Sequence, residues 1–328
     1  MFILRSISAC ILSFIVTFLL VPVMRSLAYT FGIIDVPDGK IKTHKQATPY
    51  LGGIAVYAGF LFALAATMSL STDIIPLVVG CTVLLFVGLL DDIITITPLQ
   101  KFLGQLGAAI ILVKGGFYLK DEFFHTYWFL AIPCSLLWIL TITNAINLVD
   151  IMDGLAVTIA GGATLSFLVI ALFAQNSTAA LMVASLLGAL IAFYLFNKMP
   201  ARIYLGDAGA LFIGGVLASV PFLFNWSLIQ KYGLVSPLVI LGVPILEVCS
   251  LIAIRMKNNI PFYLGSPHHF AHYLQRKKWM NKVILFFVLG VSLLLGVIAG
   301  LFLYGYLSIW HMFWVLGGVL GFWLAIVY

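Results

Sequence analysis

Long apolar stretches separated by short polar segments constrain this chain more than any other feature of its sequence. A helix needs about 20 predominantly apolar residues to cross a bilayer. Lipid offers no partner for an unpaired backbone group, so such stretches form helices. The sequence predicts eleven spans: 3–27, 51–70, 74–90, 102–119, 127–146, 154–174, 178–196, 208–225, 233–254, 283–304 and 308–328. We therefore expect an all-α polytopic membrane protein with about eleven transmembrane helices, ten at the least.

The composition agrees with this class and excludes others. Of the 328 residues, 63% are hydrophobic and 9% are charged, whereas a soluble domain has about 25% charged residues. The net charge of +6 forms no clustered basic face, so we expect no nucleic-acid partner. The first apolar stretch is too long for the core of a signal peptide and is interpreted as the first span. No repeat or linker interrupts the chain, which predicts a single membrane domain over residues 1–328.

Basic residues are distributed unequally between the two sets of connecting loops. One set comprises residues 28–50, 91–101, 147–153, 197–207 and 255–282. With its flanks it holds 13 of the 17 Lys and Arg residues, and the other side holds Arg5, Lys114, Lys120 and Lys231. Lys and Arg are retained on the cytoplasmic side of a membrane. We therefore expect a multi-pass protein of the inner (cytoplasmic) membrane, with the first set of loops in the cytoplasm and the N-terminus outside.

The polar residues that could carry chemistry lie in the same set of loops or just inside the adjoining spans. An ionisable group at membrane depth costs about 2.5–3.5 kcal/mol, so a cluster of such groups indicates a functional site. The candidates are His44, Asp91, Asp92, Asn144, Asn147, Asp150, Asp153, Asp207, His268, His269 and His272. The sequence therefore predicts an active site on the cytoplasmic face.

A pair of acids, Asp91 and Asp92, ends the third predicted span, and Lys101 follows at the start of the next. Neighbouring residues on a helix point about 100° apart, so both carboxylates reach one ligand only where the helix is unwound. Paired acids beside a cation-rich loop suit a Mg²⁺-diphosphate site, because Mg²⁺ prefers hard oxygen ligands. The alternative is an acidic cap at the membrane interface.

A row of polar residues ends the fifth predicted span, with Asn144, Asn147, Asp150 and Asp153 at intervals of three residues. On a helix surface, residues at this spacing adjoin and form one polar seam. The alternative to a binding site is a polar contact between helices, which usually uses neutral side chains. The two acids favour the binding site.

Two further segments carry candidate ligands for phosphate or metal. Asp207 lies between Gly206 and Gly209, which allow the backbone to approach a ligand closely, and the alternative is an ordinary helix N-cap. Lys42 stands in a basic loop, and its amine suits phosphate binding as a point charge. Retention of positive charge in the cytoplasm explains other lysines of that loop equally well.

Three histidines, His268, His269 and His272, lie in the last predicted cytoplasmic loop. The i, i+4 spacing of His268 and His272 is also a zinc-ligand spacing, but no HExxH motif accompanies it. Phosphate or uracil binding fits this setting better, and the alternative is a basic loop at the membrane interface.

Together these motifs resemble the polyprenyl-phosphate N-acetylhexosamine-1-phosphate transferase family, from residue 35 to residue 276. The resemblance implies a Mg²⁺-dependent enzyme, with Mn²⁺ as the second candidate metal. Such an enzyme transfers a sugar 1-phosphate from a UDP-sugar to polyprenyl (undecaprenyl) phosphate in the membrane and releases UMP, as the first membrane step of cell-envelope glycan synthesis. A homodimer is left open.

The resemblance also implies roles for individual residues. The implied catalytic residues are Asp91, Asp92, Lys101, His269 and His272, and the implied metal ligands are Asp207 and Asp92. The implied substrate-binding residues are Lys42, Asn144, Asn147, Asp150, Asp153, Asn197 and Tyr204, with the uracil stacked on Tyr204.

The sequence departs from the family pattern in places that bear on the donor. Ile151 stands where the family usually has Gly, and Ala210 where it usually has Ser. The Pro-Leu-His-His-His pattern of the phospho-N-acetylmuramoyl-pentapeptide enzymes is absent, which favours a UDP-N-acetylhexosamine over the pentapeptide precursor as donor. We expect the transferred group to be N-acetylglucosamine 1-phosphate. The rival from another class is a transporter of nucleotides or anionic lipids. Such proteins place their sites near the membrane midplane between internal repeats, which this sequence lacks.

Overall fold

The computed structural model describes all residues except 1, 36–46, 69–73, 262–266 and 328. Over these residues the chain is almost entirely helical, with one pair of short strands. The elements are α1 (Phe2–Phe31), β1 (Ile34–Asp35), β2 (Thr48–Pro49), α2 (Gly52–Thr67), α3 (Ile75–Ile94), α4 (Pro98–Lys114), α5 (Glu122–Thr126), α6 (Trp128–Leu148), α7 (Leu155–Phe173), α8 (Ser177–Asn197), α9 (Gly206–Ser219), η1 (Val220–Leu223), α10 (Trp226–Ile229), α11 (Val235–Ile240), α12 (Gly242–Lys257), α13 (Phe270–Arg276), α14 (Asn281–Leu303) and α15 (Ile309–Val327).

Eight helical stretches in the described part of the chain are long and apolar enough to cross a membrane. They are α1, α3, α6, α7, α8, α9 with η1, α14 and α15. The expectation of an all-α, multi-pass membrane protein is therefore confirmed. The count of eleven is not.

The three remaining predicted spans correspond to shorter or interrupted helices. The stretch 51–70 contains α2, which has 16 residues, and 102–119 overlaps α4, which has 17 and carries Lys101 and Lys114. The stretch 233–254 is interrupted at Leu241, where α11 ends and α12 begins. Apolar composition alone did not reveal this interruption, because the residues on both sides of it are equally hydrophobic.

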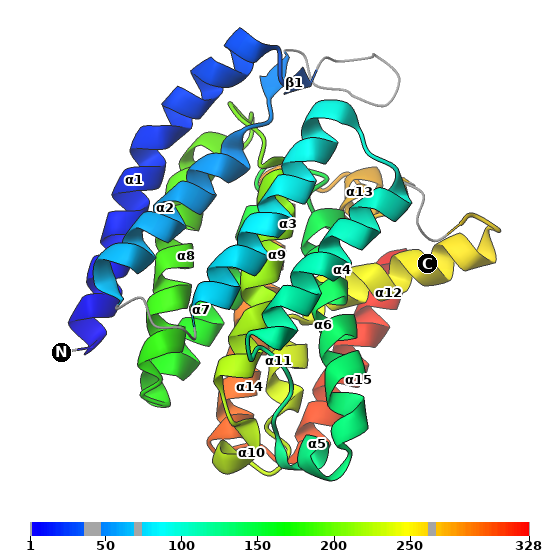
Figure 1. Cartoon of the computed structure of the whole chain (residues 1–328). Coiled ribbons are helices and arrows are strands. Elements are labelled where there is room, and N and C mark those ends of the chain that lie inside the picture. Colours follow the sequence, from blue (N-terminus) through cyan, green and yellow to red (C-terminus); the bar gives the residue numbers. More distant parts are fainter. Residues whose placement is uncertain (1, 36–46, 69–73, 262–266, 328) are drawn as a thin grey trace.

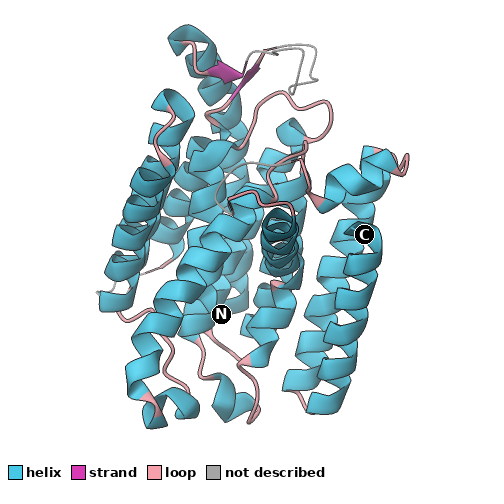
Figure 2. Cartoon of the chain, turned by 90° about the vertical axis from the view of Figure 1, so that its right-hand side faces the viewer, coloured by secondary structure: helices cyan, strands magenta, loops and turns pink. Residues whose placement is uncertain are grey.

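Most helices run side by side along one axis, and the connections gather at the two ends of the bundle (Figure 1). The strands, the turn between α3 and α4, and α13 lie at one end, which we call the β1 end, while α5 and α10 lie at the other (Figure 1). Figure 2 shows the same bundle from the side, with the strands near its top beside the end of a helix. The α12 helix runs across this axis (Figure 1).

The α9 helix is the most deeply buried span, and it packs closely against α2 and α3 through glycines. A Cβ atom added to Gly53 would lie 2.2 Å from the backbone nitrogen of Gly209, and one added to Gly88 would lie 2.4 Å from that of Ala208. The backbone N–H groups of Gly52 and Gly53 also donate to the carbonyls of Tyr204 and Leu205, at 3.1 and 2.9 Å. The start of α9 is therefore fixed by backbone contacts with α2 and α3.

Gly53→Ala is expected to lower the apparent melting temperature of the purified protein. The added methyl group would meet backbone rather than a flexible side chain, and overpacking of this kind costs about 1–3 kcal/mol. Thermal unfolding in detergent, followed by tryptophan fluorescence, measures the change. Gly161→Ala in α7 is the matched control, since nothing lies within 4 Å of its added Cβ. Equal melting temperatures for the two variants would contradict the close contact.

Candidate active site

Side chains from three helices meet around the amine of Lys101, on a fourth helix, at the β1 end of the bundle. Its Nζ donates to Oδ2 of Asp91 at 2.8 Å, to Oδ2 of Asp207, and to Oδ1 of Asn147 at 3.4 Å. Asn147 in turn donates from Nδ2 to Oδ1 of Asp207 at 2.7 Å. We call Asp91, Lys101, Asn147 and Asp207 the carboxylate–lysine cluster. The structure thus brings together four residues that the sequence places up to 116 positions apart.

The turn between α3 and α4 brings Lys101 close to Asp91. The α3 helix ends at Thr95, which has a left-handed φ of 51°, and the N–H of Ile96 donates to Oδ1 of Asp91 at 3.0 Å. Thr97 and Gln100 then form a capping box that starts α4, with hydrogen bonds of 2.9 and 3.3 Å. Lys101 therefore lies on the first turn of α4, facing the end of α3.

Asp92 accepts hydrogen bonds from a different element than Asp91 does. Its Oδ1 accepts the N–H of Asp207 at 2.9 Å and its Oδ2 accepts that of Ala208 at 3.0 Å, so it caps the start of α9. Gly206, with a φ of 72°, allows this approach, since a Cβ there would lie 2.6 Å from the Asp92 carboxylate. The α3 helix continues to Ile94, so the expected unwinding at the acids is not found, and the two carboxylates point to different elements.

The row Asn144, Asn147, Asp150 and Asp153 is not one helical seam. The α6 helix ends at Leu148, so only the two asparagines lie on it, and the acids lie in the turn before α7. Asn144 exchanges two hydrogen bonds with Gln105 of α4, at 3.2 and 2.8 Å. This is the polar contact between helices given above as the alternative to a binding site. It supplies the Asn144 amide with hydrogen-bond partners inside the protein.

Asp153 and Asn197 join two segments at the β1 end. Oδ2 of Asp153 accepts the N–H of Ala201 at 2.9 Å. Asn197 is buried and accepts from the N–H of Gly154 at 3.0 Å, while its Nδ2 donates to the carbonyl of Ile203 at 2.9 Å. Both ends of the Asn197 amide are thus bonded to backbone, which gives this side chain a structural role.

Asp150 lies in the same turn, and its protonation differs from that of an ordinary aspartate. Burial, followed by the negative charges of Asp207 and Asp92, raises the pKa of Asp150 to about 8. The Asp150 side chain is therefore mostly protonated at neutral pH, and a cation placed beside it would favour release of that proton.

Tyr204 lies against the two-stranded hairpin. The strands pair antiparallel, with Asp35 opposite Thr48, and the N–H of Tyr204 donates to the carbonyl of Pro49 at 2.8 Å. Its ring is 5.9 Å from that of Tyr50. Lys42 belongs to the connection between these strands and lies outside the described residues.

Two of the candidate histidines, His269 and His272, lie at the start of α13. Nδ1 of His269 lies 2.8 Å from Oε1 of Glu247, and Nδ1 of His272 lies 3.0 Å from Oε1 of Gln275. Gln275 also donates to the sulfur of Met152 at 3.3 Å, which joins α13 to the turn that carries Asp150 and Asp153. The sequence motifs gave Glu247 no role, although a lone acid within an apolar run is itself a signal of function.

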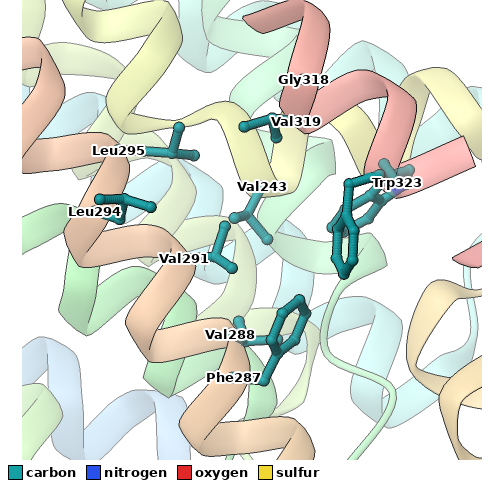
Figure 3. Close-up of a pocket in the computed structure, with 10 residues that line it drawn as sticks. Val243, Phe287, Val288, Val291, Leu294, Leu295, Gly318, Val319 and Trp323 are labelled. Carbon is teal, nitrogen blue, oxygen red and sulfur yellow. The ribbon is translucent and has the colours of Figure 1, made fainter. Parts of the chain in front are cut away.

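An apolar cavity in the described part of the bundle adds no chemical group to this site. It lies between α12, α14 and α15, has a volume of about 190 Å³, and is lined by residues such as Val243, Val291 and Trp323 (Figure 3). A nucleotide needs polar partners that such a lining lacks. The polar groups of the β1 end are therefore the candidate site for an anionic substrate.

The carboxylates of the cluster suit a shared metal ion rather than one held by the protein alone. Within the described ranges, no three His, Cys, Asp or Glu side chains are grouped closely enough to hold a metal. Mg²⁺ commonly takes one or two carboxylates and completes its octahedral shell with water and substrate phosphates. Asp91 and Asp207, which flank the positive charge of Lys101, provide such a pair. The donor set therefore fits Mg²⁺ that arrives with a phosphorylated substrate.

Fold and site together define a multi-pass membrane protein with a charged site at one end of its helical bundle. A family model for glycosyl transferase family 4 matches residues 74–225, which include every residue of the carboxylate–lysine cluster. A Bacillus subtilis protein, the "Probable undecaprenyl-phosphate N-acetylglucosaminyl 1-phosphate transferase", is 32% identical over 82% of this chain and 77% of its own length. The chain belongs to glycosyl transferase family 4.

Two further relatives carry the name of a different enzyme. The "Phospho-N-acetylmuramoyl-pentapeptide-transferase" of Geobacillus thermodenitrificans is 30% identical over 86% of this chain and 94% of its own length. The protein of the same name from Heliobacterium modesticaldum is 32% identical over 64% of this chain and 71% of its own length. Similarity to both kinds of relative agrees with the family resemblance and leaves the donor to be established.

Proposed function

We propose that this protein transfers N-acetylglucosamine 1-phosphate from UDP-N-acetylglucosamine to polyprenyl phosphate, in a single membrane domain, and releases UMP. The observation that carries the proposal is the carboxylate–lysine cluster at the β1 end of the bundle. A site at the end of a membrane bundle can be reached both by a nucleotide from water and by the head group of a lipid. The name of the Bacillus subtilis relative describes an N-acetylglucosaminyl 1-phosphate transferase that acts on undecaprenyl-phosphate, and the names of the other two describe a phospho-N-acetylmuramoyl-pentapeptide-transferase.

In this reaction a phosphate oxygen of the lipid attacks the β-phosphorus of the UDP-sugar, and the bond to the UMP oxygen breaks with its electron pair. A phosphate monoester is already ionised at neutral pH, because its second pKa is about 6. The attacking group therefore needs orientation and charge neutralisation more than a general base. Lys101 supplies positive charge between Asp91 and Asp207, and His269 and His272 supply further polar contacts beside the α6–α7 turn. Mg²⁺, when bound by Asp91 and Asp207, would neutralise charge on the diphosphate.

The contacts divide the remaining candidates into binding and supporting residues. Asp150, Asp153, Tyr204 and Lys42 remain candidates for the nucleotide. Asn144, Asn197 and Asp92 are already bonded to protein groups and hold α4, the 198–205 segment and the start of α9, respectively. We propose that these three act by fixing the elements of the site.

The test is UMP release from the detergent-solubilised protein given polyprenyl phosphate and one UDP-sugar at a time. We expect release with UDP-N-acetylglucosamine and little with UDP-N-acetylmuramoyl-pentapeptide. Release with the pentapeptide donor alone would support the second type of relative. Release with neither donor would indicate an enzyme that uses another donor. Nucleotide uptake into vesicles without turnover would favour a transporter.

The active site is expected to face the cytoplasm of the inner membrane. Lys278 follows α13 at the β1 end, whereas Lys231 lies beyond α10 at the opposite end, and both side chains are exposed. A cysteine at Lys278 should be protected from a membrane-impermeant thiol reagent in intact cells, and one at Lys231 should react. Labelling of the wild-type protein, whose Cys249 is exposed, sets the background. Reaction at Lys278 alone would invert the topology.

A further inference from the structure

A fully buried acid on α12 contacts one of the candidate histidines. Glu247 has 0% of its surface exposed, and its Oε1 lies 2.8 Å from Nδ1 of His269. Its Oε2 accepts the N–H of Phe270, the first residue of α13, at 3.4 Å. A buried carboxylate is tolerated only with such partners, because its desolvation is otherwise costly. Both oxygens of Glu247 are thus directed at the start of α13.

This contact fixes which ring nitrogen is left for another partner. An ionised carboxylate only accepts hydrogen bonds, so Nδ1 of His269 carries the shared proton. Nε2 is on the opposite edge of the ring, and no hydrogen bond within the described segments uses it. A partner on one nitrogen sets the tautomer and orientation of an imidazole, and so determines what the other nitrogen presents.

A chain of side-chain contacts links the ring of His269 to the α6–α7 turn. It stands 5.9 Å from the ring of His272 in an edge-to-face arrangement. His272 contacts Gln275, and Gln275 contacts Met152 in the turn with Asp150. Arg255 on the same helix as Glu247 adds a positive charge near the acid.

We propose that Glu247 is a positioning residue of the active site. It holds the ring of His269 with Nδ1–H on its carboxylate, so that Nε2 is presented to a phosphate oxygen of the substrate. In its doubly protonated form, His269 then donates Nε2–H to that oxygen. The inference rests on the proposed function, which supplies the phosphate, but the contact between the two side chains can be tested without turnover.

The kinetic test compares Glu247→Leu, His269→Ala and the double variant by steady-state UMP release. Loss of a group that orients a ligand commonly costs about 10-fold to 100-fold, and we expect a fall of this size in kcat for each single variant. If Glu247 acts through His269, the double variant should equal His269→Ala within about two-fold. Glu247→Gln, which keeps an acceptor oxygen, should recover most of the activity. Multiplied losses in the double variant would overturn the proposal.

The structural test uses protein labelled with ¹⁵N-histidine, since the chain has only six histidines. Two-bond ¹H–¹⁵N spectra should show a ring protonated at Nδ1 that is lost in His269→Ala and altered in Glu247→Leu. Ser185→Ala is the control: Ser185 is buried on α8 and its hydroxyl donates within that helix, to the carbonyl of Leu181 at 2.8 Å, so its loss should leave the signal unchanged.

The two tests separate this inference from the proposed function. If no UDP-sugar yields UMP but the Nδ1 signal depends on Glu247, the proposed function fails and the contact stands. If transfer occurs and Glu247→Leu changes neither the signal nor kcat, the positioning role is wrong.

Discussion

Asp207→Asn is expected to lower kcat for UMP release by about 1,000-fold, while the protein still folds. The substitution keeps the shape of the side chain and removes a charged oxygen ligand. It also weakens the acceptor of Lys101 and Asn147, which both donate to the Asp207 carboxylate. Mg²⁺ tolerates few changes in its octahedral shell, so the dependence on Mg²⁺ concentration should change together with the rate.

The matched control for Asp207 is Asp121→Asn at the opposite end of the bundle. Asp121 is buried and accepts the N–H of Ser227 at 2.9 Å, so the same substitution tests the loss of a hydrogen-bonded carboxylate far from the cluster. UMP release is measured against Mg²⁺ concentration for both variants and the wild type. If Asp207→Asn keeps the wild-type rate and metal dependence, Asp207 is not a metal ligand, and Asp91 would have to hold the ion with another group.

Lys101→Met is expected to lower kcat by about 100-fold and to lower the apparent melting temperature. The methionine keeps most of the apolar stem, but Asp91 and Asp207 lose the positive charge between them. Their side chains are 16% and 32% exposed, so water screens part of the resulting repulsion and folding should survive. Higher Mg²⁺ concentrations should restore stability more than activity, because the ion can neutralise the acids but cannot take the place of an amine on the substrate.

Lys114→Met provides the comparison for Lys101, since it removes the same charge from the last turn of the same helix. It should leave both rate and melting temperature near those of the wild type. A Lys101→Met protein with normal kcat would show that the amine only balances the acids in the folded chain. In that case Lys101 would have no catalytic role.

The class of fold, and the gathering of several polar residues at one end of the bundle, were accessible from the sequence for physical reasons. Apolar stretches must become helices in lipid. Burying an acid in the membrane costs free energy, so acids there indicate a functional site. The motifs around Asp91, Asn147 and Asp207 therefore predicted polar groups at one end of the bundle, and these residues do meet around Lys101. The roles of these residues in catalysis stay predictions.

The details that sequence reasoning missed depend on contacts between distant segments. Periodicity placed Asn144 in the same seam as the acids, but its amide is satisfied by Gln105 on α4. A pair of adjacent acids could not show that Asp92 caps α9 while Asp91 faces Lys101. Glu247 stayed unassigned for the same reason, since its partner His269 lies 22 residues along the chain in another helix.

The close contact of α9 with α2 and α3 bears on the order in which the site is assembled during synthesis. Every group of the carboxylate–lysine cluster, and every helix that holds one, precedes Phe224. Membrane and soluble chains alike emerge from the ribosome N-terminal end first, and early segments can associate before later ones exist. The acids, the lysine and their glycine contacts can therefore come together while α12 and α13 are still untranslated. The partnership of Glu247 with His269 would then be added to a catalytic end that is already formed.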